Sequence, residues 1–247
     1  MHNKRILLCS GNGPRTVCWY FKEDHLKKYN TMKMGRGFTQ VVTTRAGQYV
    51  FGGEFRGDFG DDSDTSYEYL PTGSKNWTIV RSSIPGGYDY GFNIASKSGK
   101  EVWLIGGLCT ENRILQFNIV DQTFEELPTQ LIVSRERPRC AFIPNTNKIM
   151  ITGGYDDDST EIFDPEEGTV TLAGKLNSKR SSHGIGILTI NGQDKLAVFG
   201  GSDDHHNVLR SVELYDYQND KWEISYIKLP KATSNFGFLS YKQGKLL

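Results

Sequence analysis

The sequence has little of what membrane proteins, secreted scaffolds and nucleic-acid-binding proteins need. It has no run of about eighteen apolar residues, the length that a membrane-spanning helix requires. The apolar residues after Arg5 are too few for the core of a signal peptide. Lys plus Arg and Asp plus Glu number 29 each, so no charge excess is available to hold nucleic acid or an anionic membrane. We therefore expect no nucleic-acid partner and no membrane partner.

Catalytic signatures are missing as well. The sequence contains no Gly-x-Ser-x-Gly, no Walker phosphate loop, no His-Glu-x-x-His and no Cys-x-x-Cys. It shows no sustained helical periodicity, so almost no helix is expected. These absences predict a protein without catalytic residues, metal ligands or a cofactor.

The four cysteines are too few for a disulfide scaffold of 247 residues. Cys9 and Cys18 flank a predicted hairpin turn and could lie opposite each other, whereas Cys109 and Cys140 fall in different parts of the chain. The favoured interpretation is four reduced thiols in a cytoplasmic protein, with secretion as the alternative.

Glycine pairs recur along the chain at a nearly fixed spacing. They are Gly52-Gly53, Gly106-Gly107, Gly153-Gly154 and Gly200-Gly201, at steps of 54, 47 and 47 residues. Each pair follows a short apolar run, which predicts a strand buried on both faces. The glycines then allow backbone dihedrals that a side chain would forbid. A period of this length predicts a repeat architecture.

Two large side chains follow each glycine pair. Tyr215 and Trp222 are seven residues apart, whereas Tyr69 and Trp77 are eight apart. Phe117 with Phe124 and Phe163 with Val170 occupy the corresponding places in the other units. We predict that the glycine pairs and the anchors Tyr69, Trp77, Tyr215 and Trp222 are structural, and that the anchors pack between strands and between neighbouring units.

A glycine doublet followed by Tyr and then Trp resembles the kelch repeat, as found in kelch-like and galactose-oxidase-type propellers. The resemblance implies an all-β, kelch-type β-propeller with one four-stranded antiparallel blade per unit. It spans nearly the whole chain as a single domain, 1–247. The repeats cover approximately 1–34, 35–85, 86–134, 135–178, 179–231 and a partial 232–247.

The repeat phase predicts that the chain begins and ends inside blades. With the strands of a blade labelled a to d, the sequence reads b-c-d, four complete units and then a-b. This order favours a six-bladed propeller that is incomplete at its termini, because ring closure normally leaves no open sheet edge. A five-bladed ring with a surplus strand is the alternative.

The predicted loops carry opposite charges. The b–c loops are acidic, as in Asp156-Asp157-Asp158 and Asp203-Asp204-His205-His206, whereas the d–a connections are basic. In an antiparallel blade these two kinds of loop lie at the same end, so we expect either neutralisation there or a binding surface of mixed charge. A divalent metal site in the acidic loops is less favoured than solvated loops, because no calcium-loop spacing is present.

Several large polar or aromatic side chains fall near the expected loop face. Arg and Tyr are typical interface anchors, and the Arg guanidinium suits carboxylate partners. The alternative is that those on the inner strands only line a channel and hold water. The predicted partner-binding residues are Arg36, Tyr90, Arg137, Arg139, Arg180, His183 and Phe236.

These observations predict a non-catalytic module that recognises a protein through the loops on one propeller face. The kelch resemblance implies two typical roles, substrate recognition for a cullin-based ubiquitin ligase and actin binding. The alternative from a different class is a carbohydrate-active or metal-dependent kelch-type enzyme that uses the same face.

Overall fold

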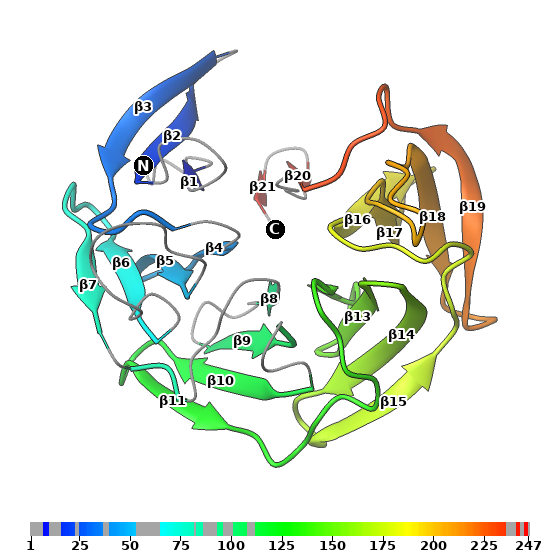
Figure 1. The fold of residues 1–247 in the computed structure, drawn as a ribbon, viewed down its shortest axis with the longest axis horizontal. Helices are drawn as coiled ribbons and strands as arrows, with labels where there is room; N and C mark the ends of the chain where they lie inside the picture. Colours follow the sequence, from blue (N-terminus) through cyan, green and yellow to red (C-terminus); the bar gives the residue numbers. More distant parts are fainter. Residues whose placement is uncertain are drawn as a thin grey trace. The chain divides into compact units, whose positions relative to one another are not determined.

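The computed structural model is all-β (Figure 1). It describes residues 7–9, 16–22, 25–36, 40–52, 65–81, 83–85, 93–95, 101–107, 112–235, 241–242 and 245–246, and these form 21 strands and no helix. Accordingly, no membrane-spanning helix occurs in this part of the chain.

Four blades each contain four antiparallel strands in chain order, and this arrangement confirms the predicted β-propeller fold. Shorter sheets of three and two strands flank them, so the predicted order of three strands, four complete blades and two strands is also confirmed. The first sheet contains β1 (Leu7–Cys9), β2 (Val17–Lys22) and β3 (His25–Thr31), and the last contains β20 (Tyr241–Lys242) and β21 (Lys245–Leu246). The complete blades are β4 (Gln40–Thr43), β5 (Gly47–Phe51), β6 (Tyr67–Pro71) and β7 (Thr78–Val80); β8 (Asn93–Ala95), β9 (Glu101–Ile105), β10 (Ile114–Asn118) and β11 (Thr123–Glu126); β12 (Arg139–Phe142), β13 (Ile149–Gly154), β14 (Asp157–Asp164) and β15 (Thr169–Ala173); and β16 (Gly184–Ile190), β17 (Gln193–Phe199), β18 (Ser211–Asp216) and β19 (Lys221–Lys228).

The chain forms two compact units, each with its own core. The first unit comprises Met1–Thr110 and Leu115–Leu127, and the second comprises Glu111–Ile114 and Pro128–Leu247. In the first unit, aromatic residues of blades β4–β7 and β8–β11 form one buried cluster that includes Tyr49, Phe51, Tyr67 and Phe117. In the second unit, apolar residues of blades β12–β15 and β16–β19 form another, which includes Met150, Leu196, Tyr215 and Trp222. The predicted packing of Tyr215 and Trp222 between blades is therefore confirmed.

The glycine pairs end the second strand of each blade, as predicted. The first glycine has a positive φ of 49° at Gly52, 70° at Gly106, 57° at Gly153 and 55° at Gly200. A Cβ atom on Gly153 would lie 2.4 Å from the carbonyl oxygen of Arg180, which belongs to the next d–a connection. Both the backbone conformation and the close approach of a second segment therefore require glycine at this position.

The strand register corrects one of the predicted anchors. Tyr215 pairs with Trp222 and Phe117 pairs with Phe124. In the blade β4–β7, however, Tyr69 pairs with Thr78, so Leu70 is the residue that lies opposite Trp77. Leu70 and Trp77 are buried together in one cluster, whereas Tyr69 packs against a different one. The anchor equivalent to Tyr215 is therefore Leu70, and the spacing to Trp77 is seven residues, as in the other blades.

The cysteines do not all remain reduced. Cys9 lies directly opposite Cys18 in the register of β1 and β2, as the hairpin prediction allowed. Cys18 is disulfide-bonded, whereas Cys140 is a buried thiol outside any disulfide, and burial raises its pKa. The favoured interpretation of four reduced thiols is therefore wrong.

Candidate partner-binding face

A buried arginine joins three segments of the blade β16–β19. Arg180, in the connection that leads into β16, donates hydrogen bonds to the carbonyl oxygen of Gly200 at 2.7 Å and to Ser211 Oγ at 2.9 Å. Its Nη2 atom also lies 2.5 Å from the carboxylate of Glu213, and both charged side chains have no exposed surface. The other oxygen of Glu213 accepts hydrogen bonds from the backbone and side-chain nitrogens of Asn177. The d–a connection is thereby fixed to the glycine pair and to the third strand.

The same Arg–Ser–Glu cluster occurs in two other blades. Its members there are Arg135, Ser159 and Glu161 with the carbonyl oxygen of Gly153, and Arg36, Ser66 and Glu68 with that of Gly52. Sequence reasoning missed this cluster, although the recurring Ser-x-Glu at the start of the third strand was a visible signal. Its position directly below the loops makes it the framework that holds them.

The blade β8–β11 lacks the cluster. In the blade β4–β7 the glutamate of the cluster, Glu68, pairs with Val50 and lies two residues before the anchor Leu70. The residue two places before the anchor Phe117 of the blade β8–β11 is Leu115, which is fully buried in the core. The sequence position that corresponds to the arginine holds Asp89, which lies outside the described residues. At these two positions the sequence of this blade has neither the arginine nor the glutamate, and an apolar residue replaces the glutamate.

Three predicted partner contacts are placed in the interior. Arg36 and His183 have no exposed surface and Arg180 is 1% exposed. The predicted partner-binding set mixes positions that are not equivalent, because Arg36 corresponds to Arg135 and Arg180 and not to Arg139. In each blade the residue before the glycine pair is paired with a residue of the first strand, and these three arginines each lie four residues before that partner. The expectation that Arg36, Arg180 and His183 are accessible at a surface is therefore wrong. Tyr90 and Phe236 lie outside the described residues, and their predicted role stays a prediction.

His183 is held by a short hydrogen-bond chain. Its Nε2 atom lies 2.8 Å from Thr152 Oγ1, and the Thr152 hydroxyl donates to the carbonyl oxygen of Arg139. The donor and acceptor roles between Thr152 and His183 Nε2 depend on the tautomer of His183. Nδ1 is buried and has no hydrogen-bond partner among the described residues. Burial, together with the positive charges of Arg139 and Arg180, lowers the pKa of His183 well below its ordinary value of 6.5.

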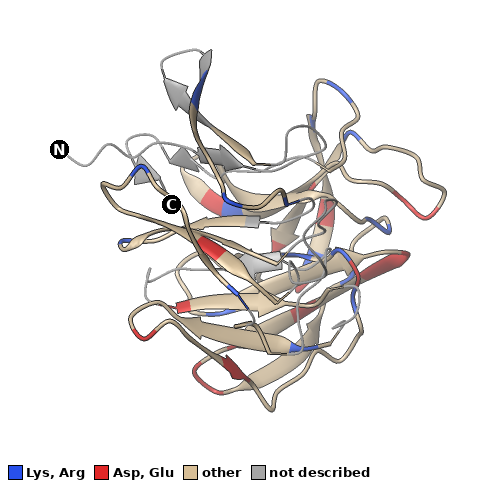
Figure 2. Ribbon diagram, turned by 60° about the vertical axis from the view of Figure 1, so that its left-hand side comes forward, with Lys and Arg blue, Asp and Glu red and all other residues tan. Residues whose placement is uncertain are grey.

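The predicted meeting of acidic and basic loops at one end is confirmed in the second unit. Lys179, in a d–a connection, lies 2.7 Å from Asp156 and 3.6 Å from Asp204, which follow two different glycine pairs. Lys175 lies 3.1 Å from Asp158. Acidic and basic positions accordingly alternate among the described residues instead of forming regions of one sign (Figure 2). The b–c connection after Gly154 is also shorter than expected, because β14 already begins at Asp157.

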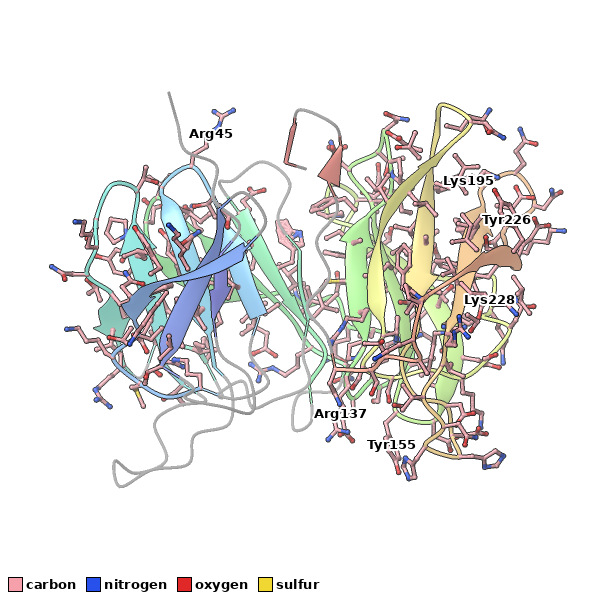
Figure 3. All side chains as sticks on the ribbon, turned by 90° about the horizontal axis from the view of Figure 1, so that it is seen from above. Arg45, Arg137, Tyr155, Lys195, Tyr226 and Lys228 are labelled. Atoms are coloured by element: carbon pink, nitrogen blue, oxygen red, sulfur yellow. The ribbon has the colours of Figure 1, made fainter. Side chains whose placement is uncertain are left out.

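An aromatic side chain stands out at this end. Tyr155 is 52% exposed, and its ring centroid lies 6.2 Å from that of His206 in the next blade. The backbone nitrogen of Tyr155 donates a hydrogen bond to the carbonyl oxygen of Glu136, the residue that precedes Arg137. Figure 3 shows Arg137 and Tyr155 projecting from the same end of the second unit, whereas Tyr226 projects from its side. We call Arg137, Tyr155, Lys179 and His206, with Asp156 and Asp204, the loop face.

The described residues hold no group of three or more His, Cys, Asp or Glu side chains that could bind a metal ion. His205 and His206 are exposed on the loop that follows Gly201, and Asp203 accepts hydrogen bonds from the backbone of this same loop. The chemistry that the loop face offers in the described part of the chain is therefore aromatic contact, hydrogen bonding and ion pairing.

Comparison with known proteins agrees with this architecture. A family model for the kelch motif matches residues 191–224, which include Glu213, Tyr215 and Trp222. The F-box/kelch-repeat protein SKIP20 of Arabidopsis thaliana is 30% identical over 96 residues, which cover 34% of this chain and 22% of SKIP20. The fold is a β-propeller, and its residues 191–224 match the kelch motif, in agreement with the resemblance that the glycine pairs and anchors indicated.

Proposed function

We propose that the chain is a non-catalytic module that binds a protein partner through the loop face of its second unit. The observation that carries this proposal is the exposed Tyr155, whose ring lies beside that of His206 at the end of the unit held by the buried Arg–Glu pairs. Tyr presents a large contact area at little entropic cost and is enriched at the centre of interfaces. Charged residues surround it, and such a charged rim favours partner selection and association rate.

The framework below the loop face supports a binding role. The Arg135 and Arg180 clusters fix the base of the loops, so little freedom is lost there when a partner binds. Lys179 contacts both Asp156 and Asp204, so these three side chains together present one net negative charge to a partner.

We further propose that the partner is a substrate of a ubiquitin ligase and that this chain is the recognition part of the adaptor. SKIP20 is named as an F-box/kelch-repeat protein, and this similarity motivates the proposed role. Actin binding is the other role that the kelch resemblance implies, and a cytoplasmic location stays a prediction.

The experiment is capture of partners from the native organism by the wild-type chain and by a Tyr155→Ser/His206→Ser variant. The matched control is Tyr226→Ser, because Tyr226 is 85% exposed but lies on the outer strand β19. We expect a partner that is retained by wild type and by the control, in the presence of chelator, and lost from the double variant.

Two outcomes would contradict the proposal. Loss of the partner from the Tyr226 control alone would place binding on the outer strand. Loss on chelation would favour the metal-dependent alternative instead.

A further inference from the structure

Arg139 differs from the other arginines of the second unit that enter the interior. It is half-buried at the first position of β12, and its Nε atom donates to the carbonyl oxygen of His183 at 2.7 Å. Its Nη1 atom lies 3.3 Å from the carbonyl oxygen of Pro138. Both acceptors are neutral, and no carboxylate of the described residues contacts this guanidinium. Arg135 and Arg180, in contrast, each contact a buried glutamate.

The carboxylates of Glu161 and Asp157, which belong to the same blade as Arg139, already accept hydrogen bonds from other residues. Glu161 accepts hydrogen bonds from Arg135 and from the backbone of Ile132 and Val133. Asp157 accepts from Arg135 and from Ser159. Both carboxylates are therefore engaged by other donors, and neither of them contacts Arg139.

The guanidinium is held ready for an additional acceptor. It has five N–H donors, of which the two carbonyl contacts use two. The backbone of Arg139 is also fixed, because its carbonyl oxygen accepts from Thr152, whose hydroxyl is bonded to His183. An arginine that is oriented in advance loses less freedom per hydrogen bond on binding.

The surroundings of Arg139 favour a negatively charged ligand. Burial lowers the pKa of Arg139 to about 10, so the group remains charged at neutral pH while being poorly solvated. A single unpaired positive charge matches a carboxylate, whereas a phosphate monoester carries about 1.5 to 2 negative charges. The observations therefore favour a carboxylate over a phosphate.

We propose that the free Nη donors of Arg139 bind the carboxylate of an Asp or Glu side chain that the partner protein inserts beside the loop face. The proposal rests on the proposed protein-binding function and names the chemistry of its partner. Arg139 begins β12 two residues after Arg137, and Thr152, with which it pairs, immediately precedes Gly153. The residue therefore lies at the end of the blade that carries the loop face.

The test begins with selection of peptides from a phage-displayed random library, in which the peptides have no free C-terminus. We expect the selected peptides to share an acidic residue at a fixed position. Replacing this residue by its amide should weaken binding to the wild-type chain roughly ten- to a hundredfold, the range expected for hydrogen bonds to a charged group.

A double-mutant cycle assigns the effect to Arg139. The variant Arg139→Gln should lose the same factor toward the acidic peptide, and the amide peptide should bind wild type and variant equally. Lys195→Gln is the matched control, because Lys195 projects from the opposite end of the second unit (Figure 3). In case Arg139→Gln does not fold, the Nε–H proton resonance of Arg139 in the wild-type chain should shift on titration with the acidic peptide and not with the amide peptide.

Several results would overturn the assignment. Selected peptides without a required acidic residue would do so, as would the absence of any enriched acidic peptide, an unmoved Arg139 resonance, or a cycle that couples the acid to Arg137. Tighter binding of the peptide with phosphoserine in place of the acid would make the ligand a phosphate. The proposed function is decided separately by partner capture, so a captured partner without a required carboxylate would end the Arg139 proposal alone.

Discussion

Removing the carboxylate of Glu213 should destabilise the second unit strongly. In the variant Glu213→Leu the hydrogen bond to Arg180 Nη2 at 2.5 Å and the two to Asn177 at 2.8 Å each are lost. Arg180 then remains as a buried charge without a carboxylate. Breaking a buried ion pair on one side typically costs about 3–5 kcal/mol. Whole domains have about 5–15 kcal/mol of stability, so the variant should lose a large share of it.

The double variant Arg180→Met/Glu213→Leu should recover part of this loss. It removes the unpaired charge and leaves neutral groups unsatisfied, chiefly the carbonyl oxygen of Gly200 and the backbone nitrogen of Asn177. Each such group costs about 1–3 kcal/mol when buried and unpaired. Leu115 already occupies the glutamate position in the blade β8–β11, so an apolar residue fits this place in the fold.

The assay is urea unfolding of Glu213→Leu, Arg180→Met, the double variant and wild type, followed by circular dichroism with the slope checked for constancy. The matched control is Glu223→Leu, in which the lost ion pair with Lys221 is exposed, and its midpoint should stay close to that of wild type. A double variant as unstable as the sum of both single variants would refute the reasoning, because the two charges would then not be coupled.

Three further predictions concern the core, the glycines and pH. Trp222→Ala should cost about 3–5 kcal/mol in urea unfolding, whereas the control Tyr226→Ala should leave the midpoint almost unchanged; an equal effect would contradict the packing between blades. Gly200→Ala should lower the melting temperature more than Gly192→Ala, because both have a positive φ but a Cβ on Gly200 would lie 2.5 Å from a carbonyl oxygen and one on Gly192 would meet nothing within 4 Å. His183 has a lowered pKa in the folded state, so below pH 6.5 the unfolded chain binds a proton that the folded chain does not. The free energy of unfolding should therefore fall as pH drops below that value, by at most about 1.4 kcal/mol per pH unit, and His183→Gln should flatten this dependence.

The architecture could be predicted from the sequence because its signals are local. An apolar run followed by two glycines specifies a buried strand and the turn that ends it, and this combination repeats. The anchor error in the blade β4–β7 has a simple cause. Tyr67 and Tyr69 are both aromatic and lie on one face of β6, whereas Leu70 lies on the other face with Trp77. Alternation along the strand distinguishes the two faces, but aromatic character alone does not.

The placement of the arginines could not be predicted from spacing to the glycine pair. Arg36, Arg135 and Arg180 precede the first glycine of their blades by 16, 18 and 20 residues, because the hairpins formed by the first and second strands differ in length. Spacing alone therefore does not show that Arg36 corresponds to Arg135 and Arg180 and not to Arg139. The free donors of Arg139 are likewise invisible in the sequence, since they depend on which carboxylates other residues have already taken.

The Arg–Ser–Glu cluster separates the anchoring of a loop from its length. Two residues connect Gly154 to Asp157, and nine connect Gly201 to Ser211. The ends of both connections are nevertheless fixed by a cluster of the same composition. The segment between the glycine pair and the third strand can therefore be exchanged without altering the residues that fix its ends. Loops with a different chemistry could be grafted between Gly201 and Ser211, so a chain of this kind can acquire new partners while its blades stay the same.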